Sequence, residues 1–226
     1  MEKLRSALSA QDFPKCLQLI KEAVLGLNDH DSRNFQIALT SPRKDDSHTQ
    51  SLLINSGINA VCTAVMNNLV QLVPLLHSHG ADLNGQHTDG NRPVHFAVLA
   101  NSSQMLAMLL ERGVDVNSRG KNDATALYIA VLNQKPAFNK LTTILLEAGA
   151  QTNITDVKGM QVVHIATLGG DTVTVSQLVK FGADINAQVG SMTSLYIACR
   201  NGNNVMAEHL LKHGASTEIP GEEELS

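Results

Sequence analysis

The sequence repeats a short phrase five times at a nearly constant spacing. Each copy contains one glycine, and these glycines lie 33, 36, 33 and 32 residues apart in a chain of 226 residues: Gly80, Gly113, Gly149, Gly182 and Gly214. An alanine stands 16 residues, or 19 in one copy, before each glycine. A fixed period near 33 predicts a supersecondary unit that buries its apolar face only against its neighbours, so we expect a solenoid.

The alanines lie in a second recurring motif, which resembles the ankyrin repeat. The five copies read NAVCTA, RPVHFA, TALYIA, QVVHIA and TSLYIA, at the position where the ankyrin family has T-P-L-H-x-A. The resemblance covers about residues 52–218. It implies an all-α solenoid of helix–turn–helix units joined by β-turn or hairpin loops. We predict five repeats, over residues 51–84, 85–117, 118–153, 154–186 and 187–218.

Three further segments flank or interrupt the expected repeats. Residues 1–26 are predicted to form a degenerate N-terminal capping repeat, residues 27–50 a polar insertion loop, and residues 219–226 a tail or linker. In the loop, Ser41-Pro42-Arg43-Lys44 matches the pattern of proline-directed kinases, so Ser41 is a candidate phosphorylation site. The alternative is a solvated basic turn balanced by Asp45 and Asp46.

Local signals predict how individual helices begin. Thr125 and Thr193 are good helix caps, because their hydroxyl groups accept backbone N–H bonds. Arg92 and Gln161 are poor caps, so we expect looser starts for their two helices. Three extra residues lengthen the third unit, and Pro136 is expected to restart its second helix.

Composition argues against several classes of function. The net charge is −4, the isoelectric point is near 6.1 and only 3% of residues are aromatic, which disfavours nucleic-acid binding and direct membrane binding. The sequence has no G-x-S-x-G, no phosphate-binding glycine loop and no H-E-x-x-H, so we predict no catalytic residue, no enzyme activity and no cofactor. The N-terminus lacks a signal-peptide pattern, which favours a cytoplasmic or nuclear protein. Three widely spaced cysteines are expected to be small core residues: Cys16, Cys62 and Cys199.

Two histidine pairs raise the alternative of a metal site. His77 and His79 are close in sequence, and His209 and His213 are four residues apart, which places two imidazoles on one helix face. The repeat supplies no third ligand, and a cation near a helix C-terminus is favourable, so we favour a structural role and predict no metal. The fourth motif position is also expected to be structural: His95, Tyr128, His164 and Tyr196.

The resemblance implies that partners dock on the concave side, formed by the fingertips of the turns and the exposed face of each first helix. Two places after each motif alanine the residue is mostly apolar: Met66, Leu99, Leu132, Leu168 and Arg200. The next place is small or an amide: Asn67, Ala100, Asn133, Gly169 and Asn201. The fingertips add further candidates: Asp89, Asn91, Arg92, Lys121, Lys158, Met160 and Met192. The alternative is that neighbouring turns cover the apolar residues as ordinary packing.

These residues predict a non-enzymatic scaffold or adaptor that binds a protein or peptide segment. The apolar row favours an amphipathic or leucine-rich partner, and we expect a monomer rather than a homodimer. Two alternatives stay open. In the first, the array is the targeting or substrate-recognition arm of a larger enzyme or ubiquitin-ligase assembly. In the second, it is a self-associating structural module.

Overall fold

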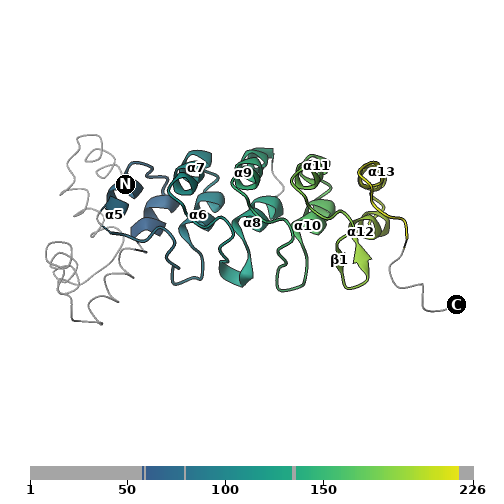
Figure 1. Ribbon diagram of the computed structural model, residues 1–226, viewed down its shortest axis with the longest axis horizontal. Coiled ribbons are helices and arrows are strands. Elements are labelled where there is room, and N and C mark those ends of the chain that lie inside the picture. Colours follow the sequence, from purple (N-terminus) through teal and green to yellow (C-terminus); the bar gives the residue numbers. More distant parts are fainter. Residues whose placement is uncertain (1–57, 59, 79, 134–135, 219–226) are drawn as a thin grey trace.

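The computed structural model describes residues 58, 60–78, 80–133 and 136–218 (Figure 1). The predicted cap, insertion loop and tail, with Ser41, Cys16 and His79, lie outside the described residues. Residues 60–66 are helical. The further helices are α5 (Leu72–Ser78), α6 (Pro93–Leu99), α7 (Ser103–Glu111), α8 (Ala126–Leu132), α9 (Pro136–Glu147), α10 (Val162–Gly169), α11 (Thr172–Lys180), α12 (Ser194–Arg200) and α13 (Asn204–Lys212).

The helices are arranged as pairs in one elongated stack. In Figure 1 the first helices of the pairs, α6, α8, α10 and α12, form one row, and the second helices, α7, α9, α11 and α13, form another. Each helix contacts its partner and the corresponding helix of the neighbouring pair. The predicted all-α solenoid is therefore confirmed, while the repeat boundaries stay a prediction.

One apolar core runs along the stack between the two rows. The second helices each contribute fully buried leucines, among them Leu109, Leu145, Leu178 and Leu210. Burying one such side chain stabilises the fold by about 1.5–3 kcal/mol. Because these residues contact neighbouring units, each unit depends on the next for its stability.

The loops project from the side of the first helices, and one contains a short hairpin. Strand β1 (Gln188–Val189) pairs antiparallel with β2 (Met192–Thr193), and Val189 lies opposite Met192. Gly190 in the connecting turn has φ 60°, a conformation that glycine adopts without steric cost. The loop between α7 and α8 contains the 3₁₀ turn η1 (Lys121–Asp123).

Two predicted helix caps are confirmed. The hydroxyl oxygen of Thr125 accepts from the N–H of Tyr128 at 3.2 Å, and that of Thr193 accepts from the N–H of Tyr196 at 3.3 Å. Helix α9 begins at Pro136, as predicted.

The looser starts expected at Arg92 and Gln161 were wrong, because the third helical residue closes each start. The N–H of Arg92 donates to Nδ1 of His95, and the N–H of Gln161 donates to Nδ1 of His164, both at 3.1 Å. Each histidine replaces the missing cap by accepting the N–H of the residue that precedes the helix. The sequence had indicated a structural role for both histidines but not this bond.

The same histidines tie each first helix to the next loop. Both rings are fully buried. Since Nδ1 accepts a hydrogen bond in each ring, Nε2 carries the proton and donates. Nε2 of His95 donates to the carbonyl of Ser118 at 3.1 Å, and Nε2 of His164 donates to the carbonyl of Ala187 at 2.9 Å. Each imidazole thus joins the start of its own helix to the next loop.

Of the two described cysteines, one agrees with the expectation of a core residue and one does not. Cys62 is buried, and burial raises the pKa of its thiol to about 12. Cys199 is exposed, so the prediction that it is a core residue was wrong. Across the described ranges, no helix has the length and apolar character needed to span a membrane.

Candidate interaction surface

Four large apolar side chains form a row along the first helices. They stand at the same place, the last turn of successive first helices, and they are half-exposed: Met66 (44%), Leu99 (51%), Leu132 (51%) and Leu168 (49%). Because α6 contacts α8 and α8 contacts α10, the helices that carry Leu99, Leu132 and Leu168 lie side by side along the stack (Figure 1). We call these four residues the leucine stripe. Neighbouring turns leave about half of each stripe side chain uncovered.

The position after each stripe residue leaves space beside it. Ala100 and Gly169 are exposed. The side-chain Nδ2 of Asn67 donates to the carbonyl of Thr63 at 2.9 Å, and that of Asn133 donates to the carbonyl of Ile129 at 2.8 Å. Asn201 is exposed at the same position of α12.

Two predicted fingertip contacts are instead part of the stack. Asn91 is buried, at 7% exposure, and its side chain bonds to Asp89 and accepts the N–H of Lys121 at 3.1 Å. Arg92 is half-buried, and its guanidinium donates to the carbonyls of Asn84 and Arg119. We therefore leave both out of the proposed surface. Their polar groups join adjacent loops.

Asp89 is exposed, yet its carboxylate is already engaged. It accepts from the N–H of Asn91 at 2.8 Å and contacts Nδ1 of His87 at 3.0 Å. Partial burial alone would raise the pKa of Asp89, but the hydrogen bonds from Asn91 and His87 outweigh it and lower the pKa below its usual value. The second described ion pair joins Arg119 and Asp123 at 2.7 Å. The fingertip acids are thus partly neutralised within the chain.

The fingertip cations are free of such partners. Lys121 and Lys158 are exposed and form no ion pair within the ranges that the structure describes. Asp156, two residues before Lys158, accepts from the backbone N–H of Lys158 at 2.8 Å and from the hydroxyl of Tyr128 at 3.0 Å. Burial and Asp156 together raise the pKa of Tyr128 to about 12. The hydroxyl of Tyr128 therefore has a partner in the next loop, which agrees with the structural role expected for this position.

Apolar and basic groups continue the surface toward the C-terminal end. Met160 and Met192 are half-buried, and Arg200 is exposed with Nη1 3.7 Å from Sδ of Met192. Val157, at a fingertip, is 71% exposed and was missed in the sequence. Its position beside Lys158, which was predicted to be a fingertip residue, was the sequence signal that could have identified it.

The histidine pair of α13 forms a hydrogen-bonded cluster. The ring centroids of His209 and His213 are 4.3 Å apart, and Nε2 of His209 lies 2.8 Å from the hydroxyl of Ser176. Burial, His213 and Lys212 lower the pKa of His209. In the described part of the chain, no three His, Cys, Asp or Glu side chains gather as a metal site would require.

Comparison with known proteins identifies one family. A family model described as ankyrin repeats matches three times, over residues 16–120, 61–156 and 127–220. Rabankyrin-5 of Mus musculus and of Homo sapiens are each 31% identical over 88% of this chain, which spans 18% of their length. An L-asparaginase of Dirofilaria immitis is 31% identical over 75% of this chain and 28% of its own length.

Proposed function

Because the chain belongs to the ankyrin-repeat family, as its sequence predicts, we propose that it is a non-enzymatic scaffold whose leucine stripe binds an amphipathic, leucine-rich segment of another protein. Ankyrin repeats are protein–protein interaction modules, which supplies the general part of this function. The exposure of four large apolar side chains at the same place on successive first helices carries the specific part. Soluble proteins rarely leave such rows open unless a partner covers them.

The charges beside the stripe define the polar face of the segment. Lys121 and Lys158 at the fingertips and Arg200 on α12 are exposed cations, while Asp89 and Asp123 are paired within the chain. A segment with leucines on one face and acidic residues along its edge is complementary to this surface. The acidic residues add mainly orientation and association rate, and the leucines add affinity.

A charge placed on the stripe is expected to abolish this interaction. In the Leu99→Glu, Leu168→Glu double variant, two carboxylates would be desolvated against the leucines of the partner, so affinity should fall more than about 10-fold. The matched control is Val173→Glu with Val205→Glu, on α11 and α13, whose side chains are 55% and 72% exposed. Affinity capture from lysate with the three proteins, followed by mass spectrometry, checks the expectation once circular dichroism shows that all three fold.

A protein captured by the wild type and the control, and lost from the stripe variant, supports the proposal. Equal capture by all three proteins would contradict it. Sedimentation over a range of concentrations tests self-association separately. If the wild type forms a dimer and the stripe variant does not, the molecule that binds the leucine stripe is a second copy of this chain.

A further inference from the structure

A regular hydrogen-bond pattern joins successive loops at the residues that follow each second helix in the chain. In the loops at 82–84, 115–117 and 184–186, an aspartate Oδ1 accepts the N–H of the asparagine two residues later, at 2.8–2.9 Å. The turn holds the asparagine so that its Oδ1 accepts an N–H from the next loop. These bonds run from Asp115 to Asn84 at 2.9 Å, from Gln151 to Asn117 at 2.8 Å, and from Ser216 to Asn186 at 2.8 Å.

The loop at 149–153 breaks this pattern. Gln151 stands where the other loops have aspartate. Its carboxamide is one methylene farther from the backbone, so it does not close the same turn. Between residues 149 and 186, which the structure describes throughout, the N–H of Asp184 has no bond to Asn153. One substitution in the sequence thus removes the connection between two neighbouring loops.

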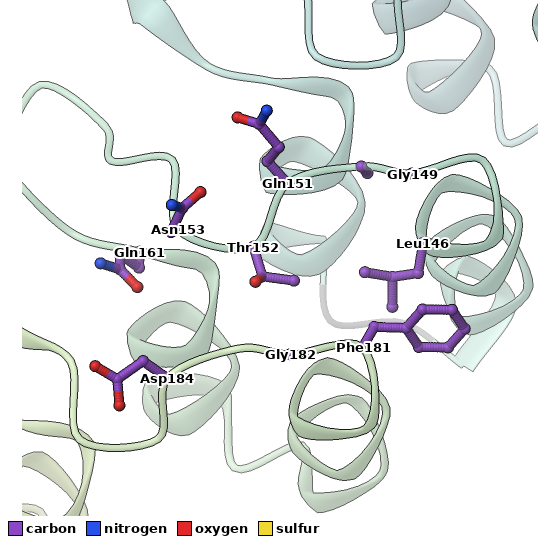
Figure 2. Close-up of a pocket in the computed structure, with 10 residues that line it drawn as sticks. Leu146, Gly149, Gln151, Thr152, Asn153, Gln161, Phe181, Gly182 and Asp184 are labelled. Atoms are coloured by element: carbon purple, nitrogen blue, oxygen red, sulfur yellow. The ribbon is translucent and has the colours of Figure 1, made fainter.

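A cavity of about 690 Å³ opens at this junction. Figure 2 shows Leu146 and Phe181 at one end, with Asn153, Gln161 and Asp184 at the other. No stripe residue lines the cavity, so it is separate from the leucine stripe. Its volume lies within the range of about 300–1,000 Å³ that is typical of ligand pockets.

The polar end of the cavity carries the carboxamides of Asn153 and Gln161, which both donate and accept, and one charge, that of Asp184. Its Oδ1 accepts from the N–H of Asn186, and the carboxylate has no ion pair among the described residues. Oε1 of Gln161 is buried and also lacks a hydrogen-bond partner there. An unmade bond at a buried acceptor is costly, and a ligand donor reached by a small rotation of the carboxamide would supply it.

The opposite end is apolar. Leu146 is buried and Phe181 is 38% exposed. Lys180 Nζ lies 5.9 Å from the centroid of the Phe181 ring. Because the Lys180 ammonium already lies near this ring, we expect the apolar part of a ligand, rather than a second cation, to pack against it.

We propose that this cavity binds an arginine side chain of a partner protein, with its methylene stem against Leu146 and Phe181 and its guanidinium against Asp184 and Gln161. A guanidinium offers five donors in one plane, which suits a carboxylate beside amide oxygens. The ammonium of lysine is a compact point charge and satisfies fewer separated acceptors. The partner thus makes a second contact, independent of the stripe.

The probe is the blocked tripeptide acetyl-Ala-Arg-Ala-amide, titrated into the full 226-residue chain and followed by ¹H–¹⁵N NMR. Saturable shifts are expected in the amides of residues 149–153 and 181–184, with affinity in the millimolar range for so small a ligand. The citrulline tripeptide, which has the same shape without the charge, should bind at least about 10-fold more weakly. The lysine tripeptide should lie between the two.

Two variants make the test specific. Asp184→Asn keeps the oxygen that accepts from Asn186 and removes the charge, so it should weaken binding of the arginine peptide at least about 10-fold. Gln151→Asp should restore the missing turn and loop connection and raise the melting temperature by about 2–4 °C. Absence of shifts in the wild type, or equal binding of the arginine and citrulline peptides, would overturn the proposal. Unchanged binding in Asp184→Asn would overturn it as well.

Discussion

His95→Ala is expected to lower the free energy of unfolding by about 2–4 kcal/mol, because it removes two buried hydrogen bonds and leaves a cavity. The imidazole accepts the N–H of Arg92 and donates to the carbonyl of Ser118, each at 3.1 Å, and the ring is fully buried. Both backbone groups lose their partner in the variant. Urea denaturation followed by circular dichroism measures the loss.

The same residue predicts how stability depends on pH. Burial, with a smaller contribution from Arg92, lowers the pKa of His95 in the folded state. An unfolded histidine titrates near pH 6.5, so below this pH the unfolded chain binds more protons than the folded one. The contribution of His95 to stability is therefore complete above about pH 6.5 and is lost as the pH falls toward the folded-state pKa. His95→Ala should show a flatter dependence than the wild type over that interval.

His77→Ala is the matched control. His77 is exposed and bonds through Nδ1 to the carbonyl of Ala81 at 3.2 Å, within its own loop. Its removal should change stability by less than about 1 kcal/mol. Equal losses for the two variants would show that the imidazole of His95 does not join its helix to the next loop as described.

The sequence predicted the parts of the fold that depend on local chemistry and on the repeat. The period near 33 residues led to the solenoid, and the hydroxyl groups of Thr125 and Thr193 led to two helix caps. The starts at Arg92 and Gln161 were judged on the cap residue alone. The compensating bonds come from histidines whose rings are held in place by the next loop, and that contact is not local in sequence.

The candidate surface was predicted in a similar, partial way. Counting from the motif alanine identified Leu99, Leu132 and Leu168, all of which are half-exposed, and their binding of a partner stays a prediction. Asn91 was included because it lies in a turn. It is buried, since a neighbouring loop supplies the N–H group that its side chain accepts.

The broken loop connection was visible in the sequence but not interpretable there. Three loops have the sequences GADLN, GVDVN and GADIN, whereas the fourth has GAQTN. The replacement of aspartate by Gln151 can therefore be seen directly in the sequence. Its consequence depends on a bond between loops about 31 residues apart, as Asn84 and Asp115 show, and on the cavity that forms where this bond is missing.

Leu145→Ala is expected to lower the free energy of unfolding by about 2–5 kcal/mol, by loss of buried apolar surface and formation of a cavity in α9. Leu145 is fully buried at the centre of the stack. Each unit of a solenoid is stabilised by its neighbours, so the loss should also weaken the coupling between the two halves and broaden the urea transition. Circular dichroism and hydrogen exchange along the chain measure both effects.

Leu132→Ala in the same unit is the matched control, and it decides between the two interpretations of the leucine stripe. Leu132 is 51% exposed, so its truncation should cost less than about 1 kcal/mol if the stripe is a binding surface. The variant should still lose affinity for the captured partner. A loss of stability comparable to that of Leu145→Ala would show that the stripe serves packing within the stack, and the proposed binding surface would then have to lie elsewhere.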